Sequence, residues 1–142
     1  LNKNNTGILG SSMGGLMALN AIIEYPENFG FAGCFSVHWI GIKPIDFFLL
    51  PIRNKVTEDQ DLVEGLKKYI DSNIKKLENH RLYFDYGTEG LDQYYSIPQN
   101  DIDKIFIKNN INFKSFMFEG HSHEEKFWAQ RFEGALDFLI AK

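Results

Sequence analysis

The chain of 142 residues has a single cysteine, Cys34, so it cannot form an internal disulfide. It has no apolar run near the roughly 20 residues that a transmembrane helix needs. The densest apolar stretch, residues 45–52, is shorter and contains Pro51. A formal net charge of −4 gives no excess of basic residues, which nucleic-acid binding requires. We therefore expect no disulfide framework, no membrane span and no nucleic-acid partner.

The sequence starts at Leu1 instead of a methionine, and a strand and a chemical motif follow almost at once. We expect the chain to be a fragment or a processed product, and any targeting segment would then have stood upstream. The sequence therefore leaves the localisation open.

The composition is that of a globular domain. Hydrophobic residues make up 44% of the chain and charged residues 24%, a balance that is typical of folded proteins. Aromatic residues reach 15%, and each one brings a large apolar area to a core. We expect one domain, or part of one, over residues 1–142.

Apolar segments of two periodicities alternate along the chain. Short runs typical of strands alternate with longer amphipathic segments typical of helices, which favours a mostly parallel sheet with helices on both faces, an α/β fold. The apolar segment at residues 40–53 has no clean period and is interpreted as a loop, a short lid or the entry to a helix. The expected strands are residues 6–9, 31–37, 81–86 and 113–118, and the expected helices are residues 13–25, 61–77, 97–109 and 127–141.

The residues from Gly10 to Gly14 fit the pattern G-x-S-x-G, with Ser12 at its centre. An apolar strand runs into the motif and an apolar helix runs out, which is the context of a nucleophile elbow. The two glycines are expected to let the backbones pass where a Cβ atom would clash. The alternative is an unreactive turn rich in glycine and serine.

A helix that begins directly after Ser12 would place free N–H groups and a positive dipole end beneath the hydroxyl. The Met13 N–H could then donate to a developing oxyanion, and one such donor is worth about 3 kcal/mol. This predicts Ser12 as a nucleophile and Met13 as part of an oxyanion hole.

A serine nucleophile needs a base, which in this type of fold comes late in the chain, after an acid. Of the four histidines, only His121 and His123 lie in the loop before the closing helix. His80 is expected at the surface. His38 follows the second strand and is expected either to line the pocket or to pack as an aromatic residue.

The acid is expected in or after the third strand, where three carboxylates lie. Asp85 lies inside the strand and is interpreted as structural. Glu89 and Asp92 both lie in the following loop, and the residues alone do not choose between them. A metal site built on His121 and His123 is a further alternative, although no third ligand with suitable spacing is evident.

These residues resemble the putative-esterase branch of the α/β-hydrolases, which includes the esterase D, feruloyl-esterase and enterochelin-esterase types. Relatives show Gly-x-x-His-x-Glu-x-x-Trp, which Gly120, His123, Glu125 and Trp128 match and which selects His123 over His121. The likeness covers nearly the whole chain and is carried by residues 8–16, 34–39, 82–92 and 120–128, with Arg131.

Relatives also tend to show Gly-Thr-x-x-Leu-Asp, which residues 87–92 match and which favours Asp92 as the acid. Many α/β-hydrolases place the acid three residues after that glycine, a position that Gly90 occupies here. Glu89 therefore stays an alternative.

The resemblance implies the C-terminal half of an α/β-hydrolase that starts at the elbow strand. A second oxyanion donor would then lie upstream of Leu1. It implies a serine esterase that forms an acyl-enzyme with Ser12, His123 and Asp92, without cofactor or metal. The alternatives are a non-catalytic binding module, an inactive fragment, or an amide hydrolase.

The expected partner is a small-molecule ester, whose identity the sequence does not reveal. His38 and Trp39 are the predicted substrate-binding residues, and the aromatic residues Phe47, Phe48 and Trp128 could line the same pocket. Sheet edges left exposed by a missing half would favour oligomers.

Overall fold

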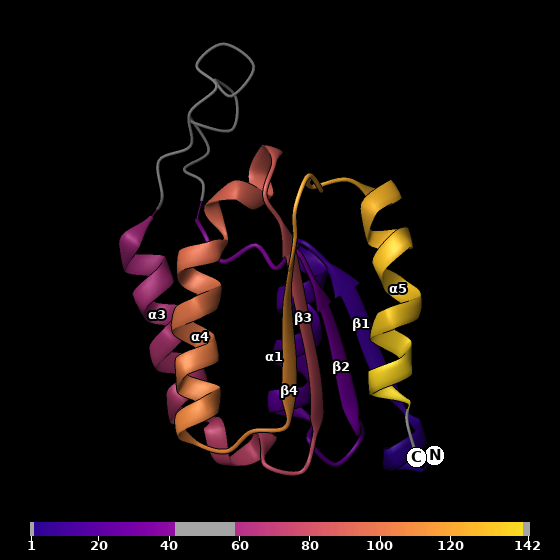
Figure 1. Cartoon of the computed structure of the whole chain (residues 1–142). Coiled ribbons are helices and arrows are strands. Elements are labelled where there is room, and N and C mark those ends of the chain that lie inside the picture. Colours follow the sequence, from indigo (N-terminus) through magenta and orange to yellow (C-terminus); the bar gives the residue numbers. More distant parts are fainter. Residues whose placement is uncertain (1, 42–58, 141–142) are drawn as a thin grey trace.

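The computed structural model describes residues 2–41 and 59–140. Its centre is a four-stranded sheet in which every neighbouring pair is parallel, in the order β1-β2-β3-β4 (Figure 1). The predicted mostly parallel sheet is therefore confirmed. The predicted loop or lid at residues 40–53 lies largely outside the described residues, as do Phe47 and Phe48. The strands are β1 (Gly7–Ser11), β2 (Phe31–Phe35), β3 (Arg81–Gly87) and β4 (Phe113–Phe118).

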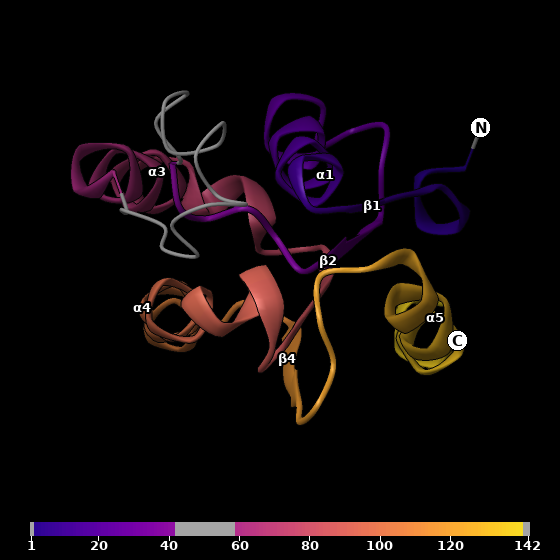
Figure 2. The same cartoon turned by 90° about the horizontal axis from the view of Figure 1, so that it is seen from above.

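Helices cover both faces of the sheet. Seen from above, α1, α3 and α4 lie on one face and α5 lies on the other (Figure 2). The helices are α1 (Met13–Glu24), α3 (Gln60–Ser72), α4 (Ser96–Lys108) and α5 (Glu125–Leu139), and short 3₁₀ turns are η1 (Lys3–Asn5), η2 (Ile74–Leu77) and η3 (Gly90–Tyr94).

The alternation of side chains along the strands divides the core into two layers. In β2, Ala32 and Cys34 pack in the larger cluster with α1, α3 and α4. Phe31 and Phe35 point to the other face and pack with α5. All five residues of β2 are buried, as expected for a strand covered on both sides.

Two predictions about the segment before β3 are wrong. The helix expected at 61–77 is interrupted at Asn73, whose side-chain amide donates to the Tyr69 carbonyl at 2.9 Å and ends α3. His80, expected at the surface, is only 3% exposed. Its Nε2 atom lies 2.9 Å from the carbonyl oxygen of Pro26, whereas its buried Nδ1 atom has no hydrogen-bond partner among the described residues.

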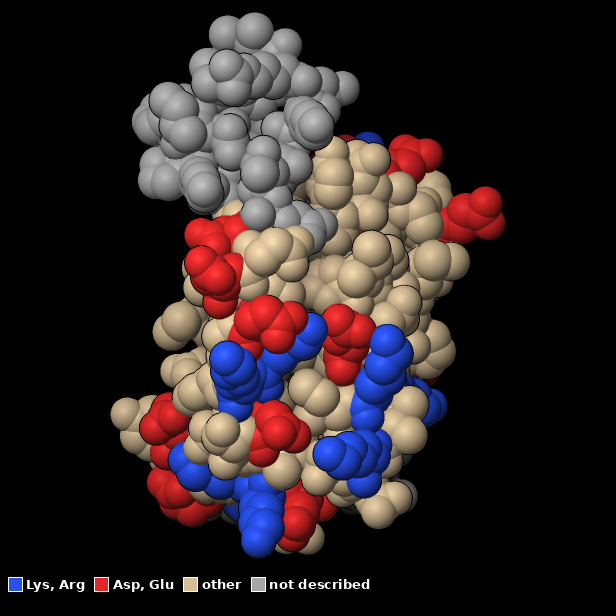
Figure 3. Space-filling model, turned by 90° about the vertical axis from the view of Figure 1, so that its left-hand side faces the viewer, with Lys and Arg blue, Asp and Glu red and all other residues tan. Residues whose placement is uncertain are grey.

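Charged residues of both signs are interspersed over the outer surface of α3 and α4 (Figure 3). Lys67 of α3 contacts Asp101 of α4 at 3.1 Å, and Lys104 contacts the same carboxylate at 2.9 Å. Ion pairs near the surface, such as these, contribute little stability. In the described part of the chain, no helix is both long and apolar enough to span a membrane.

The carboxyl ends of the four parallel strands lie at one edge of the sheet, uppermost in Figure 1. Ser12 follows β1, Ser36 follows β2, Asp92 lies in η3 after β3, and His123 lies in the loop after β4. Residues that are distant in the sequence therefore gather at this edge.

Candidate active site

Ser12 occupies a sharp turn between β1 and α1. Its backbone has φ 58° and ψ −124°, and its N–H donates to the Phe35 carbonyl at 2.8 Å. A residue other than glycine in this region carries about 1–3 kcal/mol of backbone strain, which the surrounding structure must hold in place. The turn presents the Ser12 side chain at the carboxyl edge of the sheet.

The two glycines of the motif play different parts. A Cβ atom on Gly10 would lie 2.3 Å from the carbonyl oxygen of Gly14, so the strand and the helix could not approach as they do. A Cβ atom on Gly14 would meet nothing within 4 Å. The prediction of a steric need for glycine holds at Gly10 and is wrong at Gly14.

A chain of two short hydrogen bonds joins the loops after β1, β3 and β4. The Nε2 atom of His123 lies 2.8 Å from the Oγ atom of Ser12, and the Nδ1 atom lies 2.6 Å from Oδ1 of Asp92. The side chain of Asp92 is fully buried and that of His123 is 15% exposed. The hydroxyl, the imidazole and the carboxylate thus lie in series from the surface inward.

The Asp92 carboxylate also accepts hydrogen bonds from the Ser36 hydroxyl at 2.6 Å and the Gly87 N–H at 2.7 Å. Burial alone would raise the pKa of Asp92, but the hydrogen bonds from His123, Ser36 and Gly87 outweigh it, and the pKa lies below its ordinary value. An ionised carboxylate can only accept, so His123 donates from Nδ1. Its Nε2 atom is then free to accept the Ser12 proton.

Two aromatic rings hold the imidazole of His123 edge to face. The Tyr95 ring lies 5.6 Å away at 71°, and the Trp128 ring lies 5.1 Å away at 89°. Tyr95 also shares a hydrogen bond of 2.9 Å with Nδ1 of His38. Burial, and then the charge of His123, lower the pKa of His38, which favours a neutral imidazole beside the site.

Comparison with known proteins assigns the chain to a family. The sequence profile of the family described as "Putative esterase" matches residues 1–139. The chain belongs to this family. No curated protein matches the sequence.

Solved structures of esterases and hydrolases share the fold of this family member. A ferulic acid esterase superposes with a TM-score of 0.70 and 15% identity, over 98% of this chain and 52% of its own. The enterobactin esterase FES from Shigella flexneri superposes with a TM-score of 0.67 and 19% identity, over 96% of this chain and 32% of its own. The fluorophosphonate-binding serine hydrolase FphF from Staphylococcus aureus superposes with a TM-score of 0.64 and 13% identity, over 99% of this chain and 56% of its own.

These identities show the fold alone. The chain spans about half the length, or less, of these solved relatives. The architecture predicted from the sequence, part of an α/β-hydrolase, is consistent with the shared fold and with the partial coverage.

Of the two acids left open by the sequence, the structure of this family member joins Asp92 to His123. Glu89 is exposed and precedes η3, where its backbone N–H donates to the His121 carbonyl at 3.0 Å. Asp85 is fully buried and pairs with Arg131 at 2.8 Å, in keeping with a structural role.

Trp39, predicted to bind substrate, lies in the core instead. It is 1% exposed, and its indole N–H donates to Oε1 of Gln99 at 2.7 Å. This location gives Trp39 a packing role, because no surface of the ring remains for a substrate. His38, predicted beside it, is half-buried and lies close to Ser12, with its backbone N–H 3.3 Å from the Ser12 carbonyl oxygen.

His121 and His123 point to different surroundings. The His121 ring packs against Phe127 at 4.5 Å and Phe118 at 5.4 Å, whereas His123 faces Ser12. Among residues 2–41 and 59–140, no group of three or more His, Cys, Asp or Glu side chains could hold a metal ion. The structure therefore gives no support to the alternative metal site.

The sequence did not reveal two residues of this site, Ser36, which bonds to Asp92, and Tyr95, whose ring lies against His123. Ser36 lies in a stretch that resembles relatives, but its backbone φ of 43° and its bond to Asp92 depend on tertiary contacts. Tyr95 follows Asp92 by three positions, and that spacing within a short helical turn could have suggested a shared face.

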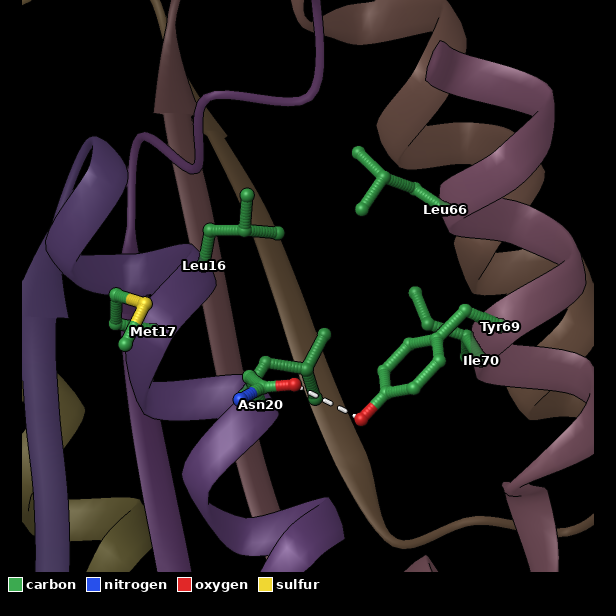
Figure 4. Close-up of a pocket in the computed structure, with 7 residues that line it drawn as sticks. Leu16, Met17, Asn20, Leu66, Tyr69 and Ile70 are labelled. Atoms are coloured by element: carbon green, nitrogen blue, oxygen red, sulfur yellow. Dashed lines mark hydrogen bonds between the residues drawn. The ribbon is translucent and has the colours of Figure 1, made fainter. Parts of the chain in front are cut away.

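Two cavities lie near the site without including it. One of about 320 Å³ lies between α1 and α3, and apart from Asn20 and Tyr69, which are joined at 2.8 Å, its walls are apolar (Figure 4). Another of about 390 Å³ lies between β1 and α5. Neither is lined by Ser12, His123 or Asp92, so neither is assigned to the substrate. The first is lined by Leu16, Met17, Leu19, Asn20, Leu66, Tyr69 and Ile70, and the second by Leu9, Gly10, Ser11, Phe35, Trp128, Ala129 and Phe132.

Proposed function

We propose that this chain is the catalytic part of a serine hydrolase that cleaves small-molecule carboxylic esters. The observation that carries the proposal is the hydrogen-bonded series Ser12–His123–Asp92, with contacts of 2.8 Å and 2.6 Å. A hydroxyl, an imidazole and a buried carboxylate hydrogen-bonded in this order have the geometry of a Ser-His-Asp triad, which supports the proposed roles. Membership of the putative esterase family supports the choice of an ester substrate.

The first half of the reaction forms an acyl-enzyme. Ser12 Oγ attacks the ester carbonyl while its proton passes to Nε2 of His123, and Asp92 stabilises the resulting imidazolium. The tetrahedral intermediate collapses when the bond to the leaving alcohol breaks and His123 returns the proton to that oxygen. In the second half, water attacks the acyl carbon while His123 takes its proton. The bond to Ser12 Oγ then breaks as His123 gives the proton to that oxygen, which releases a carboxylic acid and restores the enzyme.

The Met13 N–H is the proposed oxyanion donor from this chain. Met13 is the first residue of α1, where N–H groups have no partner within the helix. One donor of this type contributes about 3 kcal/mol to the transition state. The strained backbone of Ser12 and the start of α1 together form the proposed nucleophile elbow.

Labelling with a fluorophosphonate probe tests the proposal, because the probe phosphonylates only an activated serine. We expect an adduct on Ser12, located by mass spectrometry of the purified chain. The adduct should be absent in Ser12→Ala and strongly reduced in His123→Ala. In Ser11→Ala, which removes the neighbouring hydroxyl, it should remain on Ser12.

Absence of labelling in the chain, and in a version extended at its N-terminus, would contradict the enzyme proposal. A non-catalytic binding module would then be the better description. Labelling only in the extended version would show that the chain needs further residues to complete its oxyanion hole.

A further inference from the structure

Ser36 joins three side chains beneath the hydrogen-bonded series. It is fully buried, directly follows β2 and has a left-handed backbone, with φ 43°. Its N–H donates to the Asp85 carbonyl at 2.8 Å, which fixes the backbone of this turn to β3. Its hydroxyl lies 2.6 Å from Asp92 Oδ2, 2.9 Å from Trp128 Nε1 and 3.4 Å from Arg131 Nη2.

The direction of these bonds follows from the groups that make them. An indole N–H and a guanidinium can only donate, so the Ser36 oxygen accepts from Trp128 and Arg131. The single proton of the hydroxyl is then left for the Asp92 carboxylate. Because two donors polarise the same oxygen, the bond from Ser36 to Asp92 is strengthened.

Trp128 contacts the site at two points. Its N–H reaches Ser36, while its ring meets the His123 imidazole edge to face at 5.1 Å and 89°. Movement of this one side chain would therefore disturb both the acid and the base. Arg131 lies one helical turn further along α5, on the same face of the helix.

Arg131 lies between two buried carboxylates. Its Nη1 atom is 2.8 Å from Asp85 Oδ1 and its Nη2 atom is 3.8 Å from Asp92 Oδ2, with all three side chains at most 1% exposed. Burial raises the pKa of Asp85 to about 7 although Arg131 opposes the rise. Asp92, which accepts more hydrogen bonds, is thus the carboxylate that keeps its charge beside the guanidinium.

We propose that Ser36, Trp128 and Arg131 are positioning residues that fix the Asp92 carboxylate, and through it the His123 ring, for reaction at Ser12. The proposal rests on the proposed function, since it assigns the support of the same site. The Ser12 hydroxyl bonds to His123 and to none of these three side chains in the described part of the chain, so they act through Asp92 and His123. α5 is thereby a part of the site, in addition to covering one face of the sheet.

A double-mutant cycle tests whether Trp128 acts through the Ser36 hydroxyl. Trp128→Phe keeps a ring beside His123 and removes the N–H. Ser36→Ala and Ser36→Gly both remove the hydroxyl, and glycine also relieves the left-handed backbone, which reduces the loss of stability. The matched control is Tyr69→Phe, which keeps a ring and removes a hydroxyl bonded to Asn20 and Glu24 on the opposite face of the sheet.

The first readout is the second-order rate constant for phosphonylation of Ser12. We expect both Ser36 variants to lower it about tenfold, the ratio that one hydrogen bond supplies. Trp128→Phe should lower it about fivefold, but less than about twofold once Ser36 is glycine. A loss from Trp128→Phe that persists in full in the Ser36→Gly background would overturn the proposal.

The second readout needs no reaction. The proton between His123 Nδ1 and Asp92 gives a far-downfield NMR resonance, which should move upfield in the Ser36 variants and in Trp128→Phe, but not in Tyr69→Phe. An unchanged resonance in the Ser36 variants would overturn the positioning role. If neither the unchanged chain nor the version extended at its N-terminus reacts with the probe, the proposed function fails, while this resonance still decides the positioning role.

Discussion

The Nε2 atom of His123 lies 2.8 Å from the Oγ atom of Ser12, although 111 positions separate them in the sequence. Ser12 follows β1 and His123 follows β4, which are the two outer strands of the described sheet. The loop after β4 bridges this distance along the carboxyl edge, where the His121 carbonyl accepts hydrogen bonds from the N–H groups of Thr88 and Glu89, both at 3.0 Å. The contact therefore depends on the whole sheet.

The first prediction concerns the hydroxyl and the imidazole. In hydrolysis of a small aryl ester, Ser12→Ala and His123→Ala should each lower kcat/KM at least about a thousandfold, because the first removes the nucleophile and the second removes the base that activates it. The double variant should lose little more than either single variant. If the loss of kcat/KM in the double variant equalled the product of the two single losses, Ser12 and His123 would act independently, which would contradict the proposal.

The second prediction separates the two carboxylates that follow β3. Asp92→Asn should lower kcat at least about a hundredfold, because the amide can present an N–H to Nδ1 and favour the wrong tautomer of His123. Glu89→Gln makes the same chemical change at an exposed side chain and should stay within about twofold. Equal losses in the two variants, measured with the same ester, would reopen the choice of acid.

Most regular elements of this fold were predictable, because short apolar runs mark the strands and helical spacing marks the helices. β4 was expected at the bounds it has, and α1 begins at the predicted Met13. Ser12 was identifiable from the G-x-S-x-G motif, whereas the order of the chain left both His121 and His123 as candidate bases and the family resemblance selected His123. Asp92 needed the family resemblance as well, since Glu89 was equally placed.

The rest depended on contacts between distant residues. Buried His80 bonds to a carbonyl oxygen of Pro26, 54 positions earlier. The backbone of Ser36 is left-handed only because β3 and α5 hold it there. Trp39 lies in the core because Gln99 accepts its N–H, 60 positions later. No local pattern in the sequence carries such information.

The third prediction tests the turn before Ser12. Gly10→Ala would bring a Cβ atom to 2.3 Å from the Gly14 carbonyl oxygen, so β1 and α1 must move apart. We expect a loss of about 1–3 kcal/mol in the free energy of unfolding, together with slower labelling of Ser12.

Gly14→Ala is the matched control, because its Cβ atom would meet nothing within 4 Å. It should raise the free energy of unfolding by up to about 1 kcal/mol, since alanine favours a helix over glycine. Urea unfolding of the two variants measures both effects. An equal effect of the two substitutions would show that the close contact at Gly10 does not limit stability.

The last prediction concerns the pH dependence of stability at Asp85. Burial raises its pKa from 3.8 to about 7 in the folded chain. Between these values the folded state binds one proton that the unfolded state has released, so the contribution of Asp85 to stability falls as the pH rises. Asp85→Asn cannot titrate. The free energy of unfolding of the unchanged chain minus that of Asp85→Asn should therefore fall by about 1 kcal/mol per pH unit between about pH 5 and 7.

Urea unfolding at several pH values measures this difference, because titrations elsewhere in the chain cancel in the subtraction. Asp137→Asn makes the same chemical change at an exposed carboxylate on α5 and is the control. A constant difference at Asp85 would mean that Arg131 keeps that carboxylate ionised throughout. The Arg131 guanidinium would then be the counter-ion of both Asp85 and Asp92. Its substitution would leave two buried carboxylates that repel each other, with a loss of stability.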